Sequence, residues 1–193
     1  MRFDLQIVAS WIEDGSRVLD LGCGQGDLLD YLRADKGARG TGIEIDGEKV
    51  QAGIARGLSV LQGDIGEEIK DYPTDMFDYV ILSQTLQQVY DPLALIRDML
   101  RVGRKGIVSF PNFSHYRGRL QLLFSGVAPM TRELPYQWYD TPNIRVTTHA
   151  DFEVLARKNG LDILESFGVQ AGRVVRRRPN LMASMAVFKF QRS

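Results

Sequence analysis

The stretch Val18-Leu-Asp-Leu-Gly-Cys-Gly-Gln-Gly26 decides the fold of this chain. Residues 17–21 predict a short β-strand, and glycines at positions 22, 24 and 26 carry the chain directly into a helix predicted over residues 27–32. Glycine adopts positive φ at little cost and lets a ligand approach the backbone without meeting a Cβ atom. Because the ligand crevice of an open α/β sheet lies at the carboxyl ends of its strands, this turn is predicted to face that crevice.

Outward from this turn, strands and helices alternate along most of the chain. Strands are predicted over residues 17–21, 40–45, 58–62, 77–83, 106–110, 162–169 and 183–190. Helices are predicted over residues 3–13, 27–32, 48–56, 93–102 and 117–124, and another runs from a capping box at residues 148–151 to residue 158. This rhythm predicts an α/β fold, with a parallel sheet that is covered by helices on both faces.

The rhythm breaks over residues 112–147, after the fifth predicted strand. This segment contains the proline- and aromatic-rich run ELPYQWYDTPN at residues 133–143. A connection of this length is usually functional, so it is predicted to be a lid or an interaction surface. We therefore expect a single domain over residues 1–193, with residues 112–147 as an insertion.

The composition is that of a globular protein. The chain has 193 residues, of which 44% are apolar and 25% charged, and this argues against disordered, collagen-like and disulfide-scaffold classes. Cys23 is the one cysteine, so neither an internal disulfide nor a cysteine-bound metal is expected. No apolar run is long enough for a bilayer and the first residues do not resemble a signal peptide, so we expect a cytoplasmic protein without a membrane partner.

The net charge hides an asymmetry between the two halves of the chain. The totals of 24 basic and 24 acidic side chains cancel, which predicts no general attraction to nucleic acid. Residues 1–96 nevertheless carry 8 basic and 17 acidic side chains, and residues 97–193 carry 16 and 7. The densest basic cluster is Arg173, Arg176, Arg177 and Arg178, which is either a solvated loop or a docking surface for an acidic partner.

Three carboxylates fall at the predicted ends of successive strands. Asp20 precedes the glycine turn, while Glu44 and Asp64 follow the second and third strands. Each alone would usually be a surface or capping group, but together with the glycine turn they indicate one site. Asp20 suits a cation such as an α-ammonium group, Glu44 can accept two ribose hydroxyls, and Asp64 can accept an adenine amine. Ile45 and Ile65 would then supply apolar faces for the base.

A dinucleotide site is the alternative reading of the glycine turn. The dinucleotide fingerprint requires glycine where Asp27 stands, and a carboxylate at the start of the helix would repel a pyrophosphate. The predicted ligand therefore carries an amine, a ribose and an adenine, but no phosphate.

These motifs resemble the class I S-adenosylmethionine (SAM)-dependent methyltransferases. The resemblance rests on VLDLGCGQG (18–26), GIEID (42–46), QGDI (62–65) and FDYVILSQTLQQV (77–89). It implies a Rossmann-like, seven-stranded, mostly parallel sheet of order 3-2-1-4-5-7-6 with an antiparallel last strand. It also implies SAM or its demethylated product as ligand, with these residues around it: Asp20, Gly22, Gly24 and Gly26 at the methionine part, Glu44 at the ribose, Asp64 at the adenine, and Ser83 and Gln84 near the sulfonium.

The second half is similar to a narrower family, that of the methionine-biosynthesis protein MetW. The similarity is carried by SQTLQQV (83–89), MLRVGRKGIVSFPNFSHYRGRLQLL (99–123) and LPYQWYDTPNIRVTT (134–148). It implies a bacterial protein that acts with homoserine O-acyltransferase. It identifies no methyl acceptor, and it does not distinguish an acetyl from a succinyl donor for that partner.

Two functions follow from these resemblances: a SAM-binding partner of the acyltransferase, or a methyltransferase acting on a small molecule. The nucleic-acid amino-methylation motif Asp/Asn-Pro-Pro-Tyr is absent after the fourth strand. His115, just beyond the fifth strand, is a weak candidate for a catalytic base or a contact to the methyl acceptor, and a loop or packing role is the more usual one for such a residue. The aromatic residues Tyr136, Trp138 and Tyr139 could form a lid or an interface.

Overall fold

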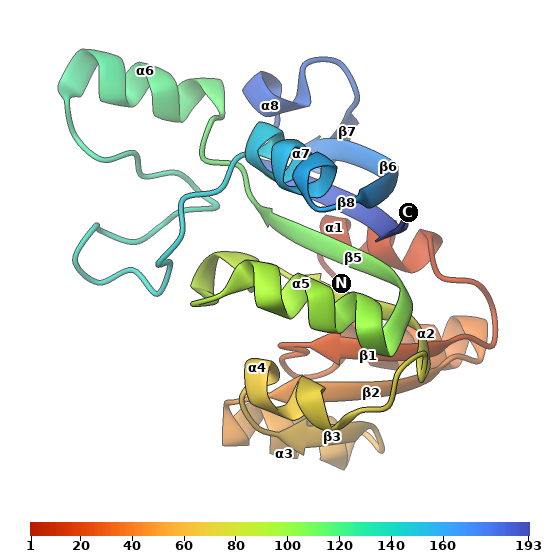
Figure 1. Ribbon diagram of the computed structural model, residues 1–193. Helices are drawn as coiled ribbons and strands as arrows, with labels where there is room; N and C mark the ends of the chain where they lie inside the picture. Colours follow the sequence, from red (N-terminus) through yellow and green to blue (C-terminus); the bar gives the residue numbers. More distant parts are fainter.

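The computed structural model describes residues 1–193 and contains one eight-stranded sheet, with the order β3-β2-β1-β4-β5-β8-β6-β7 (Figure 1). The pairs among β1 to β5 are parallel, whereas β8 is antiparallel to both β5 and β6. The strands are β1 (Arg17–Leu21), β2 (Arg39–Glu44), β3 (Ser59–Gln62), β4 (Phe77–Ser83), β5 (Gly103–Pro111), β6 (Leu161–Gln170), β7 (Arg173–Val175) and β8 (Met185–Arg192).

The predicted α/β class and strand order are confirmed, but the predicted number of strands was one too low. The additional strand is β7, which forms an edge hairpin with the end of β6. Ala171 and Gly172, with φ of +48° and +72°, make the turn that folds these residues back. The sequence Arg173-Val174-Val175 was predicted as part of a loop because three residues are too few to show a strand periodicity.

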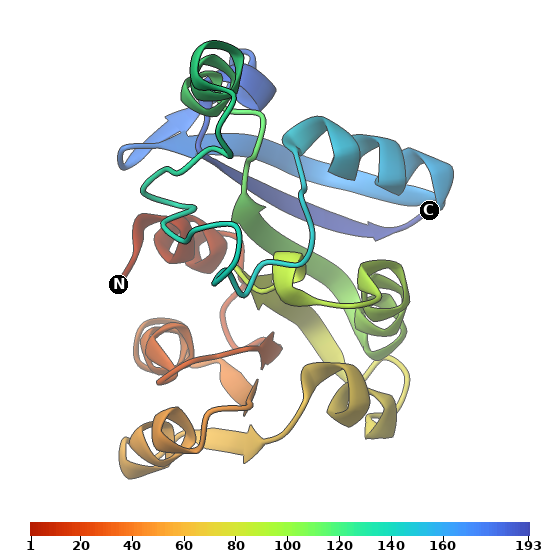
Figure 2. The ribbon, with the colours of Figure 1, turned by 90° about the vertical axis from the view of Figure 1, so that its left-hand side faces the viewer.

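Helices cover both faces of the sheet, as Figure 2 shows. α1, α2 and α3 lie on one face, and α4, α5 and α7 lie on the other. The helices are α1 (Phe3–Ser10), α2 (Asp27–Lys36), α3 (Gly47–Ala55), α4 (Ile65–Glu68), α5 (Pro92–Val102), α6 (Tyr116–Ser125), α7 (His149–Lys158) and α8 (Pro179–Met182), with 3₁₀ turns η1 (Ile69–Asp71) and η2 (Leu86–Gln88). None of them combines the length and the apolar character needed to cross a bilayer.

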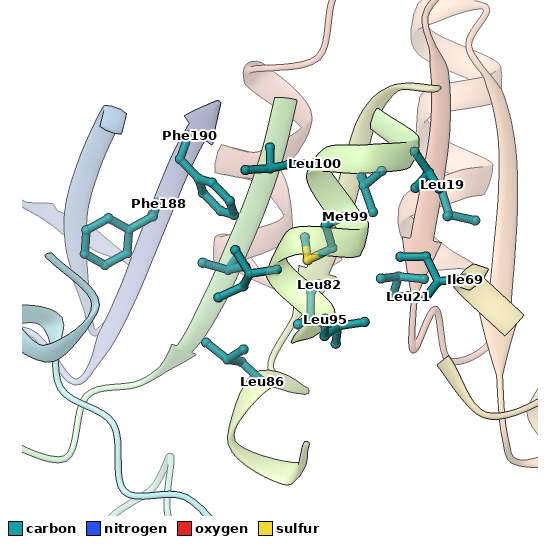
Figure 3. Close-up of a cluster of buried hydrophobic side chains, with 14 of the residues drawn as sticks. Leu19, Leu21, Ile69, Leu82, Leu86, Leu95, Met99, Leu100, Phe188 and Phe190 are labelled. Atoms are coloured by element: carbon teal, nitrogen blue, oxygen red, sulfur yellow. The ribbon is translucent and has the colours of Figure 1, made fainter. Parts of the chain in front are cut away.

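Each face of the sheet has its own apolar core. α5 is strongly amphipathic, and its residues Leu95 and Met99 face Leu21 and Leu82 of the sheet in the cluster drawn in Figure 3. The apolar residues of α1 and α2 pack with the opposite face in a second cluster. The sheet is thus buried on both sides, which explains why its central strands are almost continuously apolar.

Local sequence patterns predicted the end of α1 wrongly and the start of α7 correctly. The helix predicted over residues 3–13 ends at Ser10, because Trp11 and Ile12 bond to carbonyls three residues back and tighten the last turn. The predicted capping box of α7 is confirmed, since Thr148 accepts from the Asp151 backbone and the Asp151 carboxylate accepts from the Thr148 backbone.

Residues 112–147 leave the sheet at the carboxyl end of β5 and lie over that edge (Figures 1 and 2). α6 forms the outer part of this excursion, and the remainder, residues 126–147, is called the strap here. The backbone amides of Ile144 and Arg145 both donate to the carbonyl of Gln87, at 2.9 and 3.0 Å. The amide of Phe113 donates to the carbonyl of Thr147, so the strap is fastened where it returns to the sheet.

Candidate functional site

The glycine turn lies between β1 and α2, at the carboxyl edge of the sheet. Gly22, Gly24 and Gly26 all have positive φ, between +59° and +80°. A Cβ atom on Gly22 would lie 2.7 Å from the Thr85 hydroxyl, and one on Gly26 would lie 2.4 Å from Leu58 Cδ1. Gly24 instead has nothing within 4 Å on that side, so the turn leaves open space beside its middle residue.

Asp20 is a buried carboxylate at the end of β1, with 3% of its surface exposed. Burial, opposed by the nearby Arg2 charge and assisted by that of Glu44, raises its pKa to about 7. No protein group donates a hydrogen bond to this side chain. The protein itself thus leaves this carboxyl group without a hydrogen-bond donor, and a cationic ligand beside it would favour its charged form.

Glu44 ends β2 and reaches back to the glycine turn. Its Oε2 accepts from the Gly24 amide at 2.8 Å, and its Oε1 accepts from the Asp46 amide at 3.0 Å. The side chain is buried, so these two bonds fix the carboxylate beside the open side of the turn. Each carboxylate oxygen can accept a second hydrogen bond, which leaves capacity for two ligand hydroxyls.

Asp64, Ile45 and Ile65 surround the outer end of the same edge. Asp64 is exposed and caps the short α4, with its Oδ1 accepting from the Gly66 amide at 2.8 Å. Ile45 has 68% of its surface exposed, whereas Ile65 is half-buried against the core. Two branched apolar side chains near an exposed carboxylate form a surface suited to a flat, polar-edged ring.

Ser83 and Gln84, at the end of β4, belong to a hydrogen-bond network around Asp4. Asp4 Oδ2 accepts from Ser83 Oγ at 3.2 Å and from Gln84 Nε2 at 3.3 Å. Ser109 Oγ donates to the same oxygen at 3.4 Å, and Arg2 Nε lies 3.4 Å from Oδ1. The first residues of the chain therefore hold the ends of β4 and β5 together.

Sequence reasoning missed Arg2 and Asp4. The signal was an acidic residue between apolar neighbours, Phe3 and Leu5, on a helix that packs against the sheet. A charged residue at such a position is buried only when it is paired, and this could have indicated a partner near the strand ends.

Gln84 holds an uncommon backbone conformation, with φ of +56°. Its amide donates to the Ser109 carbonyl at 2.7 Å, and its side chain also contacts Met185 Sδ at 3.4 Å. A non-glycine residue in the left-handed region stores strain, and such residues concentrate at functional sites.

A cavity of about 680 Å³ extends from Gln84 beneath the strap. Its walls include Asp4, Gln84 and Gln87 on one side, and Glu133 and Tyr136 of the strap on the other. Glu133 accepts from Ser184 Oγ at 2.8 Å, which fastens this part of the strap to the start of β8. The cavity has the size of a small-molecule site.

His115 does not line this cavity. It precedes α6 and is buried, its ring lies 4.6 Å from that of Tyr116, and burial together with Arg117 lowers its pKa. Cys23 lies within the glycine turn, where burial and the charges of Asp20 and Glu44 raise its pKa to about 12, so its thiol stays protonated near neutral pH.

The fold is shared with solved SAM-dependent methyltransferases. The structure from Mesorhizobium loti superposes with a TM-score of 0.73 at 17% identity, covering 99% of this chain and 98% of that one. The one from Archaeoglobus fulgidus gives 0.68 at 15% identity, covering 97% and 91%. The [4+2]-cyclase SpnF gives 0.68 at 18% identity, covering 97% and 80%, so the fold also accompanies a cyclase.

Curated relatives divide into two kinds. The bifunctional methionine biosynthesis protein MetXA/MetW of Rhodopirellula baltica is 36% identical over 205 residues, covering all of this chain and 33% of that protein. A ubiquinone biosynthesis O-methyltransferase of Xanthomonas oryzae pv. oryzae is 38% identical over 97 residues, covering 48% of this chain and 40% of the enzyme. The chain thus spans less than half the length of either relative.

The family model of the methionine biosynthesis protein MetW matches residues 2–190. This match includes the glycine turn, the network around Asp4, α6 and the strap. The chain belongs to the MetW family.

Proposed function

We propose that this chain is a cytoplasmic SAM-binding protein of bacterial methionine biosynthesis that acts with homoserine O-acyltransferase. The observation that carries the ligand is Asp20, a buried carboxyl group with no hydrogen-bond donor from the protein, near the Glu44 side chain that accepts from the Gly24 amide. An ammonium group supplies both a charge and hydrogen-bond donors for Asp20, whereas the Asp27 carboxylate in the first turn of α2 disfavours a phosphate there.

Each part of the ligand has a matching protein group in this proposal. The ammonium group lies at Asp20 and the methionine part follows the glycine turn. The ribose hydroxyls bond to Glu44, whose carboxylate is already oriented by two backbone amides. The adenine lies between Ile45 and Ile65 with its amine toward Asp64, and the sulfonium faces Ser83 and Gln84. When bound, SAM supplies an electrophilic methyl group there.

The fused relative supports the partner. Its name joins MetXA to MetW in one polypeptide, and its MetW-like part aligns with the whole of this chain. Fusion raises the effective concentration of two modules for each other, which is useful where they work together. Because SAM is made from methionine, its binding could report the output of the pathway, provided that SAM binds the free and partner-bound states with different affinities.

Calorimetric titration with SAM and with its demethylated product tests the ligand. Wild-type protein should bind at least one of them. Glu44→Ala should weaken binding by about 1–3 kcal/mol, because it removes the acceptor for two hydroxyls. Glu48→Ala, which removes an exposed carboxylate from α3, is the matched control and should bind normally. Absence of binding by the wild type, or equal affinity in Glu44→Ala, contradicts the proposed pocket.

The partnership is tested by acyltransferase assays with and without this chain. The acyltransferase rate should depend on the chain, and SAM should change that dependence. If activation is the same in Glu44→Ala although nucleoside binding is lost, SAM sensing is wrong while the partnership stands. If the chain neither binds the acyltransferase nor alters its rate, the partnership is wrong.

Methyl transfer to a small molecule is the second candidate. The cavity beside Gln84 favours it, because an acceptor in that space would lie next to the proposed sulfonium position. Accumulation of the demethylated nucleoside with a methylated metabolite, in the absence of any acyltransferase, would establish this activity.

A further inference from the structure

α6 is a helix that the rest of the chain does not cover. Gly118 is its one buried residue, although its second half reads Leu120-Gln-Leu-Leu-Phe124. Leu122, Leu123 and Phe124 have 51%, 73% and 81% of their surfaces exposed, and Val127, just beyond the helix, has 57%. We call Leu122, Leu123, Phe124 and Val127 the α6 surface.

Such a helix is unusual on its own. At about 100° per residue, the apolar side chains at positions 120 and 122–124 cover an arc of about 200°, so this end of the helix has a broad apolar face. A helix with so broad an apolar face normally packs that face against another element, and a ten-residue helix without a packed face is marginal in water. A cluster of exposed apolar side chains marks an interaction site.

The surface is nevertheless held in place. Arg119 Nε donates to the Ser114 carbonyl at 2.6 Å, and Gly118 is buried beside the Phe113 carbonyl and Pro129. The strap that follows is fastened at Gln87 and Ser184. A preorganised surface loses little conformational entropy when a partner covers it.

The α6 surface is separate from the nucleoside site. None of its residues lines the cavity beside Gln84, and Figure 1 shows α6 projecting away from the sheet. Substitutions there can therefore be made without touching Asp20, Glu44 or the glycine turn.

We propose that the α6 surface is the docking site for homoserine O-acyltransferase; this rests on the partnership proposed above. The fused relative, whose name joins MetXA to MetW, aligns with all of this chain, α6 included. α6 carries Arg117 and Arg119 and no acidic residue. Its partner should therefore present an apolar groove with an acidic border.

The test is a titration of the acyltransferase with wild-type chain and with the double variant Leu123→Ala/Phe124→Ala. Both side chains are mostly exposed, so the thermal midpoint and SAM affinity of the variant should equal those of the wild type. Its affinity for the acyltransferase should fall at least about tenfold, as expected for central apolar anchors. Ile54→Ala, which truncates a side chain of 54% exposure on α3, is the matched control and should bind as the wild type does.

The outcomes separate the two proposals. If the wild type does not bind the acyltransferase, the partnership is wrong and the docking site with it. If wild type and double variant bind equally, the docking site is wrong and the partnership stands. Sedimentation of the chain alone gives a further result: a wild-type dimer that becomes monomeric in the double variant would assign the α6 surface to a second copy and overturn the proposal.

Discussion

Asp20 makes the ligand-free protein sensitive to pH. Its pKa is about 7 in the folded state, mainly because of burial, against an ordinary value near 3.8. The folded state therefore holds this proton more tightly than the unfolded state does. Between pH 4 and 7 that difference lowers stability as pH rises, by about 1–4 kcal/mol in total. Above pH 7 the contribution of Asp20 to the free energy of unfolding no longer changes with pH, so the lost stability is not regained.

Asp20→Asn removes this dependence. In urea unfolding without ligand, the variant should gain stability relative to wild type as pH rises from 5 to 8. It should also lose SAM affinity, because the amide carries no charge to pair with the ammonium group. A stability difference that stays constant over this range would show that Asp20 is not a protonated group in the folded protein.

Among the elements, those with local signals were predictable from the sequence. The β1–turn–α2 unit carries its own pattern, since alternate glycines must follow a buried strand to make that turn. Thr148 and Asp151 likewise mark the start of α7 without reference to the rest of the chain. Asp20 and Glu44 could be placed at one edge because the carboxyl ends of parallel strands meet there.

The remaining features depend on contacts between distant residues. The strap follows its path because Ile144 and Arg145 bond to the carbonyl of Gln87, and a backbone carbonyl leaves no mark on the sequence. Asp4 reaches Ser83 only after α1 has packed on the sheet. For these parts the sequence predicted a long excursion and an amphipathic helix, but not their partners.

The loop between β4 and η2 stores backbone strain at Gln84. An alanine at position 84 would still carry a Cβ atom, which is sterically strained at a φ of +56°, whereas glycine has no Cβ atom and avoids this strain. We expect Gln84→Gly to be more stable than Gln84→Ala by about 1 kcal/mol, as measured by urea unfolding. At Gln88, in the helical turn η2, the order should reverse, because glycine is disfavoured in helical conformations. The same order at both sites would contradict strain at Gln84.

At the scale of the whole molecule, the two halves of the chain carry opposite charge. Residues 1–96 have an excess of nine acidic side chains and include most of the residues of the proposed nucleoside site. Residues 97–193 have an excess of nine basic ones and form α6, the strap and the arginine cluster of residues 173–178, which includes β7 (Figure 1). The cationic ligand would thus bind to the acidic half of the chain, and the proposed acidic partner would bind to the basic half.

The charge separation predicts a difference between two sets of variants in the kinetics of acyltransferase binding. Arg177 and Arg178 are exposed, so Arg177→Gln/Arg178→Gln should act through long-range attraction. It should slow association about threefold or more at low salt and have little effect at 0.5 M, where charges are screened within a few ångströms. Arg157→Gln/Lys158→Gln, which removes two exposed charges from α7, controls for net charge and should have a smaller effect.

Leu123→Ala/Phe124→Ala should instead accelerate dissociation at every salt concentration, because it removes contacts made only in the complex. Surface plasmon resonance at two salt concentrations separates these effects. Equal association rates for all variants at low salt would show that the arginine cluster of residues 173–178 is solvated and has no part in docking.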